Sequence, residues 1–207
     1  ARMLAQRLLA AWGEPAGLVS LCVTGTQAID RALRLCLALL KDGGARPRLV
    51  AFTGAYHGEA GLAREVGSAP GLGASRATLR LPAPTCRACP VGRTPASCAA
   101  QCLDPLHKLV AQRVPAALIF EPVQITNGAL CPAPAFAHRL QHLRREAGQR
   151  MLVVADEVAG GMHRTGPLFA QEHLGLRTDV TVAGKALTAG LVPLSAVLLS
   201  RRVAVQL

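Results

Sequence analysis

Short apolar runs, each followed by a polar residue or a turn, recur along the 207-residue chain and limit the folds it can adopt. Segments with the apolar periodicity of a helix separate most of these runs. Continuous apolar strands that alternate with helices are typical of a largely parallel sheet with helices on its faces. The sequence therefore predicts an α/β fold with strands at residues 18–23, 48–52, 116–120, 151–155, 180–183 and 195–199.

Helical patterning falls between these runs, at residues 1–10, 27–40, 104–112 and 134–147. Thr24 and Gln27, three residues apart, form a capping-box signature before the second of these helices. We expect the glycine-rich segment 61–73 to be a connection and the Cys/Pro-rich segment 82–103 to be a loop.

Composition excludes several classes of protein. A hydrophobic fraction of 51% is enough for a sizeable core. No run of about eighteen apolar residues occurs, and the longest candidate, 186–199, contains Pro193, so no membrane span is predicted. The net charge is +11, but the arginines are scattered and no basic patch interleaved with aromatic residues is present, so we predict no nucleic-acid partner. The first ten residues have helical rather than signal-peptide patterning, and we expect a cytoplasmic location.

Four of the seven cysteines are clustered in the Pro-rich loop, with the spacing of a zinc or iron–sulfur site. They are Cys86, Cys89, Cys98 and Cys102. The alternative is four reduced thiols in a packed loop of an intracellular enzyme. We predict no metal and keep these four residues as candidates. Cys22, Cys36 and Cys131 lie in apolar segments and are expected to be buried.

Polar clusters follow the apolar runs at the point where each predicted strand ends. In open α/β sheets, ligands bind beyond the carboxyl ends of the strands. The clusters therefore predict one site at a single edge of the sheet, built from residues 24–26, Tyr56 with His57, Glu121, Asp156 with Glu157, and Lys185.

Two of these residues predict a specific chemistry. Lys185 follows an apolar run, and partial desolvation there would lower its pKa and make it an amine nucleophile toward a carbonyl. Asp156 ends the neighbouring strand, where a carboxylate could hold a proton on a heterocycle nitrogen. A Schiff-base lysine and a partner for the pyridinium nitrogen are the two protein groups that pyridoxal 5′-phosphate needs.

The turn at residues 24–26 lies between a strand and a helix. Its free backbone N–H groups suit a phosphate, and Gly25 allows close approach of the backbone. An ordinary capped turn is the alternative interpretation.

Together these stretches resemble the class III (omega) aminotransferases, pyridoxal-phosphate enzymes of fold type I. The resemblance covers nearly the whole chain and keeps the family's order of motifs. Ala159 departs from the glutamine common in the family and is similar to its diaminopelargonate-forming branch. The matching motifs are Thr24-Gly25-Thr26-Gln27-Ala28, Tyr56-His57-Gly58, Glu121-Pro122-Val123-Gln124, Asp156-Glu157-Val158 with Arg164-Thr165-Gly166, and Gly184-Lys185-Ala186-Leu187.

The resemblance implies a role for each matched position. Lys185 and Asp156 would be the catalytic pair, the lysine as Schiff base and proton shuttle, the aspartate on the pyridine nitrogen. The residues expected to bind the cofactor are Gly25 and Thr26 on the phosphate, Tyr56 or His57 and Val158 on the two ring faces, and Glu121, Asp156 and Lys185.

The implied function is transfer of an amino group, often a terminal one, from an amine or amino acid to a 2-oxo acid or an aldehyde. A homodimer with shared active sites is implied as well. A racemase, epimerase or aminomutase of the same family stays open, as does a non-catalytic truncated remnant. Residues 1–207 are expected to be part of the cofactor-binding large domain, without the family's N-terminal segment and C-terminal small domain.

Overall fold

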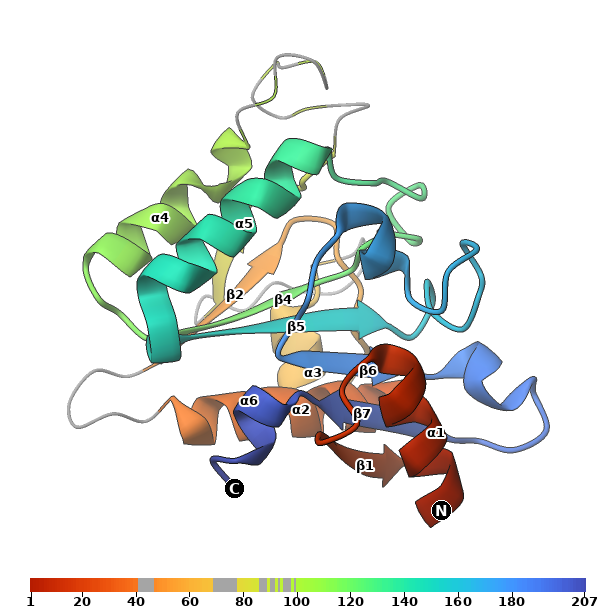
Figure 1. Cartoon of the computed structure of the whole chain (residues 1–207). Helices are drawn as coiled ribbons and strands as arrows, with labels where there is room; N and C mark the ends of the chain where they lie inside the picture. Colours follow the sequence, from red (N-terminus) through yellow and green to blue (C-terminus); the bar gives the residue numbers. More distant parts are fainter. Residues whose placement is uncertain are drawn as a thin grey trace.

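A seven-stranded sheet forms the centre of the computed structural model, which describes residues 1–40, 47–68, 78–85, 89, 92, 94, 98 and 100–207 (Figure 1). The strand order is β1-β7-β6-β5-β4-β2-β3. The strands are β1 (Leu18–Cys22), β2 (Arg48–Phe52), β3 (Thr78–Leu81), β4 (Ala116–Phe120), β5 (Met151–Glu157), β6 (Val180–Ala183) and β7 (Ser195–Leu199).

Within this sheet, β7 alone runs against its neighbours. It pairs antiparallel with β1 and β6, whereas the pairs from β6 to β3 are parallel. A parallel return needs a long crossover, and residues 184–194 between β6 and β7 contain only the short 3₁₀ helix η5 (Lys185–Thr188). The mostly parallel sheet is confirmed, and the carboxyl ends of β1 to β6 share one edge.

Helices cover both faces of the sheet (Figure 1). The core on one face includes residues of α2 (Gly25–Leu39), α3 (Gly61–Val66) and α6 (Arg201–Ala204). On the other face, α4 (Asp104–Ala111) and α5 (Pro134–Ala147) pack on the central strands, and α1 (Arg2–Trp12) packs near β6 and β7. Shorter 3₁₀ helices are η2 (Gln101–Leu103), η3 (Gly148–Arg150) and η4 (Ala170–Leu174).

Strand β2 contributes side chains to the cores on both faces of the sheet. Leu49 and Ala51 belong to the core under α2, and Val50 and Phe52 belong to the core under α4 and α5. The Phe52 ring lies 5.6 Å from the ring of Phe136 in α5. Because side chains alternate along a strand, a strand buried on both faces must be apolar throughout.

The segment predicted to be a glycine-rich connection contains a helix instead. Residues 61–66 form α3, whose start is held by a residue of another helix: Asp30 in α2 accepts the N–H of Leu62 at 2.8 Å. Gly61 has φ +57, and a Cβ there would lie 2.3 Å from Asp30 Oδ1. The helix start therefore depends on a tertiary contact, which local sequence does not reveal. Residues 69–77 of that prediction lie outside the described residues.

Two further predictions about cysteines have different outcomes. Cys22 and Cys36 are buried as expected, but Cys131 is exposed in the connection before α5, so its predicted burial is wrong. An apolar neighbourhood in sequence does not bury a residue that lies in a surface connection.

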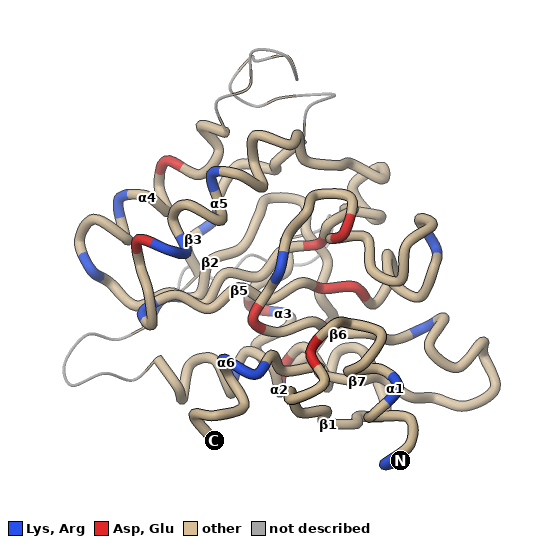
Figure 2. The backbone as a smooth tube through the Cα atoms, in the orientation of Figure 1, with Lys and Arg blue, Asp and Glu red and all other residues tan. Residues whose placement is uncertain are grey.

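Charged residues are distributed over many elements. Figure 2 shows Lys and Arg on α1, α4, α5 and α6 and in the connections, not gathered along one stripe. None of the helices in the described ranges has the length and apolar character needed to cross a membrane.

Candidate functional site

A cavity of about 490 Å³ lies at the carboxyl edge of the sheet. All the positions predicted to bind a cofactor line it: Gly25, Thr26, Tyr56, His57, Glu121, Asp156, Val158 and Lys185. Segments up to 160 residues apart in sequence therefore meet in one place, as the strand-end argument predicts. Their individual roles stay predictions.

The turn between β1 and α2 forms one wall of the cavity. Thr24 is the N-cap of α2, and its hydroxyl accepts the N–H of Gln27 at 3.1 Å. The Gln27 side chain accepts the N–H of Thr24 at 3.3 Å, which confirms the capping box. The first turn of α2, at Gly25 and Thr26, lies against the cavity, where N–H groups and the helix dipole favour an anion.

Two glycines let the strand-end turns pack closely around Val158. A Cβ on Gly25 would lie 3.1 Å from Val158 Cγ1. A Cβ on Gly184 would lie 3.2 Å from the same atom and 2.9 Å from Ser195 Oγ. Val158 is therefore held between the β1–α2 turn and the end of β6, with its side chain at the cavity wall.

The acid at the end of β5 is paired with the histidine that follows β2. Asp156 Oδ2 and His57 Nδ1 are 2.7 Å apart, and their side chains are 6% and 0% exposed. Asp156 Oδ1 accepts the N–H of Val158 at 3.1 Å. The second imidazole nitrogen of His57, Nε2, is buried and has no hydrogen-bond partner in the described part of the chain.

Glu121 lies next to this pair, directly after β4. It is 5% exposed, and its Oε1 accepts the N–H of Tyr56 at 2.9 Å. Burial raises the pKa of Glu121 to about 7; His57 opposes the rise, and the negative charge of Asp156 adds to it. The floor of the cavity thus holds two buried carboxyl groups and one imidazole.

Lys185 lies at the cavity mouth and is exposed, so the expected partial desolvation is wrong for this structure. Strand β6 ends at Ala183, and Lys185 begins η5 beyond the sheet with φ +40, in the left-handed region. Its side chain therefore projects from a turn rather than from the buried strand. A non-glycine residue in this conformation is strained, and such strain is concentrated at functional sites.

The connection between β6 and β7 forms a wall that the sequence did not single out. Residues 190–195 line the cavity, and Leu191 is 86% and Val192 56% exposed. The residue type of Leu191 and Val192 did not identify a site, because apolar residues also occur in other connections between strands. The useful signal would have been the position of this connection after β6, at the ligand-binding edge.

The cysteine candidates are only partly described. Cys86 lies outside the described residues, and within the described ranges no three His, Cys, Asp or Glu side chains are placed to hold a metal ion. Burial raises the pKa of Cys102 to about 12, and Cys98 adds to the rise. This thiol therefore stays protonated in the described structure.

The sequence model of the family described as Aminotransferase class-III matches residues 1–207. An adenosylmethionine-8-amino-7-oxononanoate aminotransferase of Geobacter sulfurreducens is 33% identical over 86% of this chain and 42% of its own length. The 4-aminobutyrate aminotransferase GabT of Escherichia coli K12 is 33% identical over 82% of this chain and 39% of its own length. The chain spans less than half the length of these curated relatives.

Solved structures also match. A thermostable (S)-enantioselective omega-transaminase from Thermomicrobium roseum superposes with a TM-score of 0.87 at 27% identity. The match covers 99% of this chain and 48% of that structure. An omega-aminotransferase from Paracoccus denitrificans, 24% identical with a TM-score of 0.86, shares the fold.

Proposed function

This chain belongs to the class III aminotransferase family, and we propose that its strand-edge cavity binds pyridoxal 5′-phosphate for amino transfer. The donor would be an amine or amino acid, and the acceptor a 2-oxo acid or an aldehyde. The observation that carries the proposal is that an exposed lysine amine and a buried carboxylate face one cavity from the ends of adjacent strands β6 and β5.

The residues around the cavity fit this cofactor in three respects. The start of α2 offers N–H groups to a phosphate, and Gly58, with φ +127, has no Cβ that would clash with Thr26. Val158 and Tyr56 offer an apolar and an aromatic surface to a flat ring. Asp156 is a buried carboxylate with lone pairs left for a protonated ring nitrogen.

Bound pyridoxal phosphate supplies an aldehyde that condenses with amines and a ring that takes up electron density. Lys185 would bind this aldehyde covalently and would hold the proton that is moved. Asp156 would keep a proton at the ring nitrogen. The N-terminus of α2 would hold the phosphate.

The same proposal covers the domain to which the chain belongs, its oligomeric state and its location. We infer that residues 1–207 belong to the cofactor-binding large domain and that the protein is a homodimer with shared active sites. Exposed apolar side chains at the cavity rim, Val23, Ile125, Leu191 and Val192, support an additional protein surface there. The described cysteines are all free, which supports a cytoplasmic location.

The test compares wild type with Lys185→Ala and Lys108→Ala, expressed from the complete reading frame. Lys108 is an exposed lysine of α4 and serves as the matched control. Wild type and Lys108→Ala should show visible absorbance with pyridoxal phosphate, and borohydride should fix the cofactor to the peptide that contains Lys185. Absence of absorbance in wild type, or trapping that survives Lys185→Ala, would contradict the proposal.

The acceptor requirement separates amino transfer from racemisation or amino migration. Transfer needs a stoichiometric oxo acid or aldehyde, whereas the other reactions proceed without a net acceptor. Turnover of an amino donor that is independent of any added acceptor would argue for the alternative reaction classes.

A further inference from the structure

A second cavity, of about 290 Å³, lies at the opposite edge of the sheet from the proposed pyridoxal phosphate site. It is next to η3, the short helix from which the chain enters β5, and is therefore at the amino edge. Among the described residues, no carboxylate group lines it. We call it the arginine cavity, and its lining residues are Arg144, Arg145, Gly148, Gln149 and Arg202.

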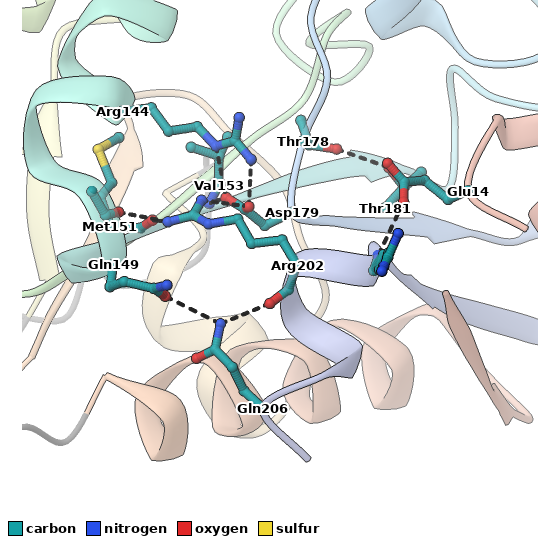
Figure 3. A network of polar contacts seen from close by, with 12 residues as sticks. Glu14, Arg144, Gln149, Met151, Val153, Thr178, Asp179, Thr181, Arg202 and Gln206 are labelled. Carbon is teal, nitrogen blue, oxygen red and sulfur yellow. Dashed lines mark hydrogen bonds and ion pairs between the residues drawn. The ribbon is translucent and has the colours of Figure 1, made fainter. Parts of the chain in front are cut away.

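One buried acid holds two of these arginines in place. Arg144 of α5 donates from Nε to Oδ2 of Asp179 at 3.0 Å and from Nη2 to Oδ1 at 2.5 Å. Arg202 of α6 donates from Nη1 to Asp179 Oδ1 at 2.7 Å and from Nη2 to the Gly148 carbonyl at 2.5 Å. Figure 3 shows both guanidinium groups converging on this carboxylate. The Asp179 side chain is 0% exposed, whereas those of the arginines are 24% and 28% exposed, so both cations are fixed in position and still reach solvent.

The pairing leaves hydrogen-bond donors on both guanidinium groups. A guanidinium group carries N–H donors on Nε and on both Nη atoms. Arg144 uses Nε and Nη2 for Asp179, so its Nη1 donors stay available within the described residues. Arg202 uses Nη1 and Nη2, so its Nε donor stays available in the same part of the chain. The carboxylate is saturated, but the two cations are not.

The charges around the arginine cavity do not balance. Of the ion pairs within the described ranges, only those of Asp179 join two arginines to one acid; Asp30 and Asp104 each pair with one arginine. The guanidinium group of Arg145 lines the same cavity and has no hydrogen bond or ion pair with any described residue. Glu146, the next residue, is exposed and does not line the cavity. Three guanidinium groups thus face one carboxylate, and positive charge is in excess.

A structural explanation covers only part of this arrangement. Cations stabilise the carboxyl end of a helix, and Arg144 and Arg145 lie in the last turn of α5. This effect does not explain Arg202, which comes from another helix and meets the same cavity. Guanidinium groups with free donors match the oxygens of a phosphate group, which they bind through paired hydrogen bonds.

We propose that the arginine cavity binds a phosphate group, either as the free ion or as part of a phosphate monoester. Arg144 and Arg202 contribute donors whose positions Asp179 fixes, and Arg145 contributes the unpaired charge. Because two of the three side chains are already ordered, binding loses little conformational entropy. This site is separate from the pyridoxal phosphate cavity, and the inference does not depend on the proposed function.

The test substitutes Arg145, because this residue takes no part in the Asp179 network. Arg7, an exposed arginine of α1 away from the arginine cavity, is the matched control for net charge. Equilibrium dialysis measures binding of ³²P-labelled inorganic phosphate to each protein, expressed from the complete reading frame. We expect Arg145→Ala to weaken binding at one site per chain by about 10- to 100-fold, the worth of one hydrogen bond to a charged group, and Arg7→Ala to stay within about threefold of wild type.

A phosphate held at the start of α2 would be present in all three proteins, so it cancels in the comparison. Equal affinities in wild type and Arg145→Ala would overturn the inference and leave an adventitious ion only. Equal losses in Arg145→Ala and Arg7→Ala would overturn it as well, because net charge alone would then explain the binding. Either result leaves the proposed function standing, and a protein that binds no pyridoxal phosphate can still pass this test.

Hydrogen exchange shows where the phosphate binds. Inorganic phosphate should slow amide exchange in the peptide that covers residues 144–151 in wild type but not in Arg145→Ala. Slower exchange that is confined to other peptides would overturn the inference. Methyl phosphate then identifies the source of the ligand: tighter binding than inorganic phosphate assigns the cavity to a monoester, and weaker binding assigns it to the free ion.

Discussion

Two buried aspartates lie at opposite ends of the β5–β6 pair, and their surroundings differ. Asp179, just before β6, is 0% exposed and is bound by Arg144 at 3.0 Å through Nε and by Arg202 at 2.7 Å through Nη1 (Figure 3). Its Oδ2 also accepts the Val153 N–H at 2.9 Å. Asp156 has one imidazole, one backbone N–H and a cavity beside it.

The difference separates a structural acid from one that is available to a ligand. Asp179 ties α5, β5 and α6 together, and its carboxylate is saturated by partners from this chain. Asp156 keeps acceptor capacity and lies at the edge where α/β folds bind ligands. Asp156 and Asp179 are alike in burial and residue type. The number of hydrogen-bond donors that this chain supplies to each carboxylate distinguishes the two.

The largest effect is expected from breaking the saturated network. Asp179→Ala leaves two arginines and the Val153 N–H without their acceptor, and loss of one partner of a buried pair costs about 3–5 kcal/mol. Asp104→Ala is the matched control, because Asp104 is 52% exposed and pairs with Arg139 at the surface. Urea unfolding should show at most about 1 kcal/mol for the control. Equal losses would show that Asp179 is not a special structural residue.

Substitution of Asp156 should lower activity rather than stability. Asp156→Asn keeps an acceptor for His57 but removes the charge, so the proposed amino transfer should fall on the order of 10²–10³-fold, as for loss of one electrostatic stabiliser. The free energy of unfolding should change by less than about 1 kcal/mol, like a substitution that retains its hydrogen bond. Steady-state kinetics and urea unfolding on the same sample provide the check. Full activity in Asp156→Asn would remove the distinction between the two acids.

Much of the contrast between the two aspartates can be predicted from the sequence, but their hydrogen-bond partners cannot. Strands β4, β6 and β7 lie where their apolar runs predict, because burial on both faces requires apolar residues throughout. The end of β5 identifies Asp156, since a carboxylate after a buried run needs a partner. That the partner is His57 depends on the turn after β2, and the cap of α3 by Asp30 depends on another helix. Contacts of this kind are tertiary and leave no local pattern.

Glu157 sharpens the comparison because it follows Asp156 directly but has different partners. Its two oxygens accept the N–H groups of Ala170 and Gln171 at 3.0 and 2.7 Å, and burial raises its pKa to about 7. A raised pKa means that the folded state binds the proton more tightly than the unfolded state. The contribution of Glu157 to the free energy of unfolding is then fully present below pH about 4.5 and is lost as the pH rises through 7, by about 3 kcal/mol in total.

The measurement is the free energy of unfolding of wild type minus that of Glu157→Gln between pH 4.5 and 8. Glu121 titrates in both proteins, so its contribution cancels. The difference should fall as the pH rises. A difference that is constant with pH would show that Glu157 titrates alike in the folded and unfolded states.

The smallest expected effect concerns the turn between β1 and α2, which contributes to stability and, in the proposed function, to phosphate binding. Thr24→Ala removes the acceptor of the Gln27 N–H and should cost about 1 kcal/mol, the usual worth of an N-cap. Thr24→Ser keeps the hydroxyl and should restore the stability. If α2 also holds a phosphate through its backbone, inorganic phosphate should raise the unfolding midpoint of wild type and of both variants alike, because the N–H groups stay in place. Loss of this stabilisation in Thr24→Ala alone would assign phosphate binding to the threonine hydroxyl rather than to the helix start.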